Sequence, residues 1–208
     1  MGLPIQQLPV FTTTIPSTKK KIKFRGFTVR EEKALLLAQE SEDVDVIIDA
    51  VRQIITSCVT DKIDFDKLTI FDIEFLMTQI RAKSVGEVVT ITMPCDADKT
   101  HDRISVSFDV SKIAVTIPEG HATTIPLYDD VGVVMKYPSV TELAKVEGAT
   151  GLDQIAMCID KIYTADEVFT SEDQTREEPR FEHEISYKCP KCGHEHRKVI
   201  RGLPNFFE

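Results

Sequence analysis

The sequence lacks the signatures of most enzymes and of membrane proteins. It has no tryptophan, and its nine glycines are scattered singly, so no glycine-rich phosphate-binding loop is present. A serine-centred nucleophile elbow and an H-E-x-x-H metal pair are also missing. No apolar run reaches the roughly 18 residues that a membrane-spanning helix needs. We therefore expect neither an enzyme nor a membrane protein.

The sequence has fewer basic than acidic residues. The chain carries 34 acidic and 25 basic residues, a formal net charge of −9, which repels a phosphate backbone. Nucleic acid is thus not an expected partner. The five cysteines are an odd number, and two of them fall in apolar helical patterns, which favours a reducing compartment over a disulfide framework. Because the N-terminus has no secretory signal pattern, we expect the cytoplasm.

The patterns that are present predict an α+β fold. The 208 residues, 42% of them hydrophobic, can bury a substantial core. We expect a helical core of about five helices with β-hairpins, including a degenerate zinc-ribbon-like pair of hairpins. The proline-rich composition of residues 1–20 predicts an extended arm that contacts a partner. Residues 21–170 predict the α+β core with a hairpin at 87–110, and residues 171–208 a connector and a C-terminal hairpin that packs on the core.

Hydrophobic periodicity predicts where the helices lie. Apolar residues at helical spacing from Val44 to Cys58 form one stripe, which places the Cys58 thiol in the core. Residues 30–41 predict the preceding helix, and residues 69–84 predict a central helix that is apolar on most sides. Four of its side chains are expected to be buried, namely Phe71, Phe75, Leu76 and Ile80. A last helix is predicted from an apolar face made of Leu152, Ile155, Ala156, Ile159 and Ile162.

One motif carries chemistry of its own, the knuckle Cys189-Pro190-Lys191-Cys192-Gly193. Two cysteines separated by two residues, with glycine directly after, form a tight turn that points both thiolates at one tetrahedral ion, as in half of a zinc ribbon. A structural zinc needs four ligands, so a second half-site is required. The strand-to-strand context argues against a redox dithiol, which favours the N-terminus of a helix.

A second loop supplies that half-site. Cys95-Asp96-Ala97-Asp98 repeats the spacing with aspartate in place of the second cysteine, and His101 follows it where His196 follows the knuckle. We therefore predict a split zinc ribbon that holds one structural Zn²⁺ between two hairpins. Its predicted ligands are Cys95, His101, Cys189 and Cys192, with Asp98, His194 and His196 as alternates. The competing hypothesis is a ribbon that folds without metal because one half-site has lost a cysteine.

Three segments resemble one protein family: residues 15–41 (IPSTKKKIKFRGFTVREEKALLLAQES), residues 71–87 (FDIEFLMTQIRAKSVGE) and residues 131–139 (VGVVMKYPS). The C-terminal CPKCG and GLPNFF are similar as well. Together they resemble the baseplate hub assembly proteins of T-even-type contractile-tailed bacteriophages. The resemblance implies a late phage protein that helps to build the central baseplate hub, either as a chaperone-like assembly factor or as a structural hub component.

The resemblance also implies partners and a place of action. The partners would be phage baseplate hub or tape-measure proteins, with a homo-oligomer as a further arrangement, and the mode of action would be binding rather than catalysis. The place would be the host cytoplasm during phage assembly, and retention in the virion baseplate is left open. The alternative, suggested by the knuckle alone, is a zinc-ribbon adaptor that binds nucleic acid or transcription machinery. The net charge of −9 favours the phage role.

Overall fold

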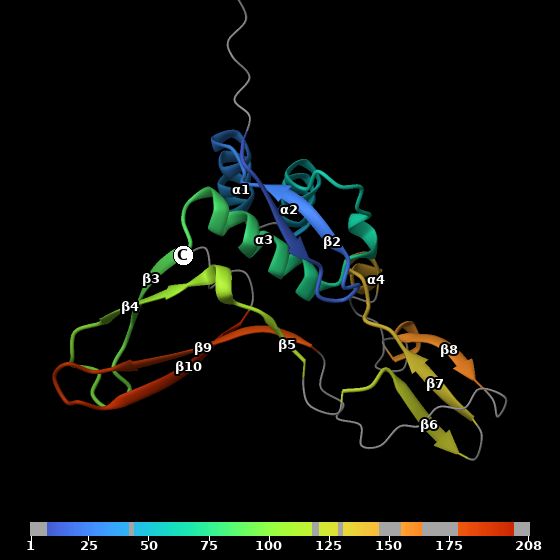
Figure 1. Cartoon of the computed structure of the whole chain (residues 1–208). Helices are drawn as coiled ribbons and strands as arrows, with labels where there is room; N and C mark the ends of the chain where they lie inside the picture. Colours follow the sequence, from blue (N-terminus) through green and yellow to red (C-terminus); the bar gives the residue numbers. More distant parts are fainter. Residues whose placement is uncertain are drawn as a thin grey trace, which may run out of the picture. The chain divides into compact units, whose positions relative to one another are not determined.

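The computed structural model describes residues 8–41, 44–117, 121–128, 131–145, 155–163 and 179–201 (Figure 1). The chain divides into two compact units. The first comprises residues 1–65, 72–115 and 181–208, and the second comprises residues 66–71 and 116–180. Helices and small sheets occur together, so the predicted α+β class is confirmed. No helix in the described ranges has both the length and the apolar character of a membrane span.

The first unit is formed by segments from both ends of the sequence. Its elements are β1 (Val10–Thr14), β2 (Lys21–Arg25), α1 (Val29–Glu40), α2 (Val44–Cys58), α3 (Ile70–Ser84), β3 (Val88–Met93), β4 (Ile104–Asp109), η2 (Val110–Lys112), β5 (Val115–Thr116), β9 (Arg180–Lys188) and β10 (Glu195–Arg201). The end residues of α3, β5 and β9 fall in the second unit. Helix α2 has the predicted bounds, and its Cys58 is fully buried.

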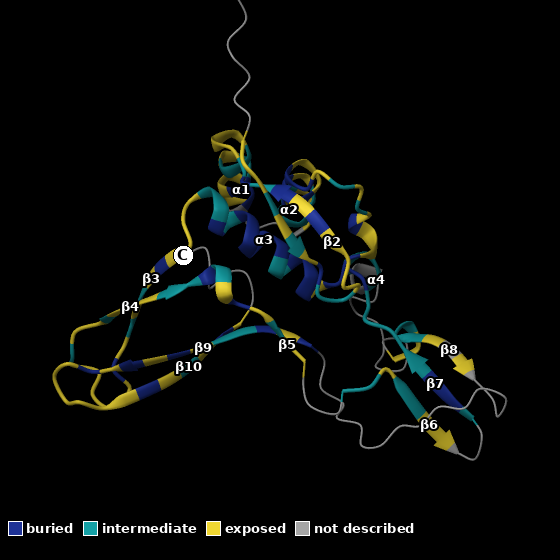
Figure 2. Cartoon of the chain, viewed as in Figure 1, coloured by how far each residue is buried: buried dark blue, intermediate teal, exposed yellow. Residues whose placement is uncertain are grey.

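Helix α3 is enclosed on most sides, as its composition predicted (Figure 2). Leu76 and Ile80 are both 0% exposed, whereas Phe75, which we expected to be buried, is only half-buried. The Asp72 carboxylate is also fully buried, and it accepts hydrogen bonds from the backbone N–H (2.9 Å) and the hydroxyl (2.5 Å) of Ser17. A satisfied buried carboxylate thus ties the turn between β1 and β2 to α3.

Residues 1–20 were predicted as an extended arm without a regular element, but a strand, β1, lies within the described part of this segment. Strand β1 pairs antiparallel with β2, so that Phe11 lies opposite Phe24 with ring centroids 5.9 Å apart. Threonines and aromatics suit a strand, and they prevail here because the prolines only flank the paired segment. The first seven residues lie outside the described residues.

Two hairpins of the first unit carry the predicted metal ligands. Strands β3 and β4 pair antiparallel from Val88 opposite Asp109 to Met93 opposite Ile104, where a hairpin was expected. Strands β9 and β10 pair from Glu182 opposite Arg201 to Lys188 opposite Glu195, and β5 adds to the other side of β9. The chemistry-bearing loops therefore connect paired strands, as the alternation of apolar and polar residues indicated.

The second unit contains a small sheet and a short helix. Its elements are η1 (Phe65–Lys67, whose first residue falls in the first unit), β6 (Thr124–Tyr128), β7 (Val131–Met135), α4 (Val140–Lys145) and β8 (Ile159–Tyr163), and the sheet order is β6-β7-β8. The last predicted helix is confirmed at residues 155–157, but the prediction is wrong for Ile159 and Ile162, because these two residues form β8 and Ile162 is 67% exposed. β-Branched residues fit a strand, and pairing with β7 outweighs their helical spacing. The start of that predicted helix lies outside the described residues.

An ion-pair network connects β2 to the first two helices. The Arg25 guanidinium donates to both carboxylate oxygens of Glu31 at 2.7 and 3.0 Å, and the two side chains are only 22% and 15% exposed. The Ser57 hydroxyl of α2 donates to the same carboxylate at 2.6 Å, and the backbone N–H of Thr28 donates to it at 2.7 Å. The hydrogen bond from Arg25 is the largest cause that lowers the pKa of Glu31 to about 2, although burial opposes it.

Replacement of Leu76 by alanine should show how much burial of α3 contributes to the stability of the chain. We expect Leu76→Ala to lower the free energy of unfolding by about 2–5 kcal/mol, since it removes a fully enclosed side chain. The control Leu36→Ala, at a position 55% exposed, should change it by no more than about 0.5 kcal/mol. Urea unfolding of both variants measures this, and equal losses would contradict the assignment of α3 as the core.

Stability should also depend on the ionisation of Glu31. Its pKa is lowered from 4.5 to about 2 in the folded chain, so its contribution is present above pH 4.5 and is lost as the pH falls towards 2. Glu31→Gln should therefore reduce the loss of stability between about pH 6 and pH 3. Glu32→Gln, one residue along α1, is the matched control and should keep the original dependence. If the stability of the wild type and of both variants showed the same pH dependence, ionisation of Glu31 would not contribute to it.

Candidate metal centre

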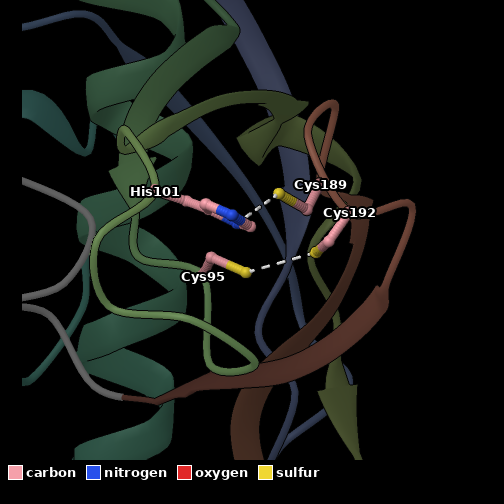
Figure 3. Close-up of side chains that lie close together, drawn as sticks. All are labelled: Cys95, His101, Cys189 and Cys192. Atoms are coloured by element: carbon pink, nitrogen blue, oxygen red, sulfur yellow. Dashed lines mark hydrogen bonds between the residues drawn. The ribbon is translucent and has the colours of Figure 1, made fainter.

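The loop between β3 and β4 folds back to present two donor side chains. Asp98 Oδ1 accepts hydrogen bonds from the backbone N–H (2.9 Å) and the hydroxyl (2.7 Å) of Thr100. The N–H of His101 donates to the Asp98 carbonyl at 3.2 Å. This Asx turn reverses the chain, so that Cys95 and His101 approach the same place from opposite sides of one loop (Figure 3).

The knuckle between β9 and β10 presents two more donor side chains, those of Cys189 and Cys192. The N–H of Gly193 donates to the Cys189 carbonyl, and the N–H of Cys189 donates to the His194 carbonyl, both at 2.9 Å. Gly193 has a φ of +72°, in the left-handed region that favours glycine. The turn directs the thiols of Cys189 and Cys192 towards the β3–β4 loop (Figure 3).

Four donor atoms converge from the two loops. The ligand atoms of Cys95, His101, Cys189 and Cys192 all lie within 4.8 Å of one another. The sulfurs of Cys95 and Cys192 are 3.8 Å apart, and the Cys189 sulfur is 3.5 Å from His101 Nδ1. Donors at tetrahedral angles, with Zn–S of about 2.3 Å and Zn–N of about 2.0–2.1 Å, stand about 3.8 Å apart for two sulfurs and about 3.5 Å for sulfur and nitrogen. The spacing therefore suits a tetrahedral Zn²⁺.

The alternates named from the sequence lie around this cluster rather than in it. Asp98 Oδ2 is 3.5 Å from His101 Nε2, the position from which a carboxylate orients a ligand ring. His194 is exposed and its ring lies edge-on to His196, with centroids 4.7 Å apart. His196 is 3% exposed, and its Nε2 lies 3.5 Å from the Cys95 sulfur. His196 is thus the alternate that reaches a cluster sulfur.

Polar contacts outside the cluster also join the two hairpins. They are Lys198 Nζ to Asp96 (3.0 Å), Lys191 Nζ to Asp102 (2.7 Å) and the Tyr187 hydroxyl to the Pro94 carbonyl (2.9 Å). The pair with Lys198 is the largest cause that lowers the pKa of Asp96. Sequence reasoning missed these contacts, because the partners are up to 102 residues apart and no local signal relates them.

The backbone of the knuckle favours a thiolate at its first cysteine. The N–H of Cys192 is the largest cause that lowers the pKa of the Cys189 thiol, to about 6, while burial opposes the shift. For Cys192, the N–H of His194 lowers the pKa, but burial and the neighbouring thiols outweigh it and leave that pKa raised. One of the thiols is thus prepared to ionise, as a metal ligand must.

Comparisons with known proteins agree on one family. The family model described as "T4 bacteriophage base plate protein" matches residues 8–180 and 176–208. The baseplate hub assembly protein gp26 of Enterobacteria phage T4 is 25% identical over 214 residues, which cover 91% of this chain and 93% of that protein. No solved structure matches the chain significantly.

Proposed function

The chain belongs to the T4 bacteriophage base plate protein family, and on that premise we propose that it assists assembly of the phage baseplate hub. The observation that carries the proposal is the extent of the likeness: the baseplate hub assembly protein of phage T4 aligns with 91% of this chain. The family model, which matches residues 8–180 and 176–208, includes both hairpins and parts of both units. We infer that the two proteins share a role as well as a fold.

The proposed mode of action is binding to other baseplate proteins, not catalysis. The cluster offers four protein donors, and a metal with four protein ligands has no open position for substrate or activated water. Hub or tape-measure proteins are the proposed partners, in the host cytoplasm during assembly. The alternative of a nucleic-acid adaptor is opposed by the net charge of −9.

An infection without this chain should test the role. A phage with an early stop codon in the gene should yield particles that lack a complete baseplate hub, with a large loss of infectious titre, and a plasmid copy of the full chain should restore both. Electron microscopy of the baseplates and plaque counts measure the effect. Affinity capture of the plasmid-borne chain should recover hub or tape-measure proteins. Normal baseplates in its absence would refute the proposal.

We propose further that the cluster holds one structural Zn²⁺, ligated by Cys95, His101, Cys189 and Cys192. The support is the donor set, three cysteines and a histidine, and the match of the 3.8 and 3.5 Å separations to a tetrahedron. Asp98 would orient the His101 ring through its second nitrogen. The ion would hold the two loops together, because each hairpin provides two of the four ligands.

Loss of one ligand should therefore remove the metal. Cys189→Ser should reduce the zinc content of the purified chain from about one ion to nearly none, measured by inductively coupled plasma mass spectrometry. Amide hydrogen exchange should quicken in both hairpin loops, while the amides of α2 remain protected, because the α2 core does not depend on the cluster. The expected result is partial unfolding.

Cys158→Ser supplies the control for thiol content. Cys158 belongs to the second unit and is not among the four clustered residues, so its loss should leave zinc and exchange unchanged. Wild-type chain that is free of zinc after expression in zinc-supplemented medium would instead support a ribbon that folds without metal.

A further inference from the structure

Two strands of the first unit border one surface hollow of about 480 Å³. One wall consists of residues 90–93 of β3, and the other consists of residues 198–200 of β10, with Arg103 beside them. Both strands come from the hairpins that carry the candidate metal centre. The hollow is therefore a second feature of the same pair of hairpins, distinct from the cluster of donors.

The hollow lies at the edges of these strands rather than on their faces. Side chains alternate between the two faces of a strand, so a wall of consecutive residues runs alongside the strand. Residues of β3 and β10 line the hollow, whereas no residue of their partner strands β4 and β9 does. In the part of the chain that the structure describes, β3 pairs only with β4, and β10 pairs only with β9. Each edge thus presents backbone N–H and C=O groups that an added strand can pair with.

The charge of the lining is opposite to that of the chain. Arg103 and Lys198 are the charged residues of the lining, although the net charge of the chain is −9; the Asp96 carboxylate offsets the charge of Lys198, so Arg103 supplies the positive charge that faces the hollow. Lys198 is held in place by Asp96 at 3.0 Å, and Arg103 is exposed to solvent. An occupant with acidic side chains would be complementary to this local charge.

A contact beside the candidate metal centre joins the two walls. Cys95 follows Met93 by two residues, and His196 precedes Lys198 by two. The Cys95 sulfur lies 3.5 Å from His196 Nε2, so the two strands are joined just beyond the ends of the lining. The walls are therefore preorganised, which reduces the cost of ordering them when a ligand binds.

We propose that the hollow between β3 and β10 binds an extended acidic segment of a partner protein by strand addition. Main-chain hydrogen bonds to an open edge provide affinity in this mode, and alternate side chains of the segment provide specificity. Acidic side chains of the segment pair with Arg103, and apolar ones contact Ile91 and Val199. The inference rests on the proposed baseplate role for the identity of the partner, a protein of the phage baseplate.

Two synthetic peptides of about seven residues test the hollow directly. One alternates glutamate with valine, and the other replaces each glutamate by lysine. Titrated into the isotope-labelled full-length chain, the acidic peptide should shift the amide resonances of residues 90–93 and 198–200, and the basic peptide should not. Arg103→Glu should lower the affinity for the acidic peptide about tenfold or more. Arg30→Glu, the same change at an exposed position of α1, should leave its affinity unchanged.

Two outcomes would overturn the proposal: neither peptide binds, or the shifts fall outside the two walls. Equal affinity for both peptides would overturn its charge preference and with it the choice of an acidic occupant. Baseplate formation in infected cells decides the proposed function separately. Peptide binding at the hollow together with normal baseplates in the absence of the chain would refute that function and leave the hollow as a strand-binding site.

Discussion

The first unit depends on the burial of α3, because three other segments reach it through hydrogen bonds. Ser17 donates to the buried Asp72, the N–H of Phe27 donates to the Ser84 hydroxyl at 2.8 Å, and the Gln79 amide donates to the Ser111 carbonyl at 3.1 Å. These bonds fix the β1–β2 turn, the entry to α1 and the end of the β3–β4 hairpin. The apolar side chains of α3 stabilise the unit, and its polar ones position what surrounds it.

The candidate metal centre has an approximate internal symmetry. The sulfur of Cys189 lies 3.5 Å from a ring nitrogen of His101, and the sulfur of Cys95 lies 3.5 Å from a ring nitrogen of His196. The first cysteine of each loop therefore contacts the histidine of the other. The equivalence stops there, because Asp98 stands where the knuckle has Cys192, and this aspartate faces His101 instead of joining the donors. The position equivalent to Cys192 thus carries a carboxylate that contacts the ring of a candidate ligand.

Short-range sequence patterns predicted helix α2 and the clustered donors, but they did not predict strand pairing or ion pairs between distant segments. The stripe from Val44 to Cys58 defined α2 because burial of one helical face needs only local periodicity. Ile159 and Ile162 misled the helix prediction, since pairing with β7 depends on a strand elsewhere in the chain. The four clustered donors could be named from repeated loop spacing, whereas the Lys191–Asp102 and Lys198–Asp96 pairs could not, because ion pairs across loops leave no pattern in sequence.

The long separation between the two loops also sets an order of events during synthesis. Cys192 follows Cys95 by 97 residues, so a nascent chain displays one half of the cluster long before the other exists. Closing a longer loop adds little entropic cost, so the late hairpin can still dock on a body that has already folded. The β10 wall of the hollow arrives with that hairpin. A nascent chain that ends before residue 198 therefore lacks one wall of the hollow, and a ligand that needs both walls can bind only after synthesis has passed residue 200.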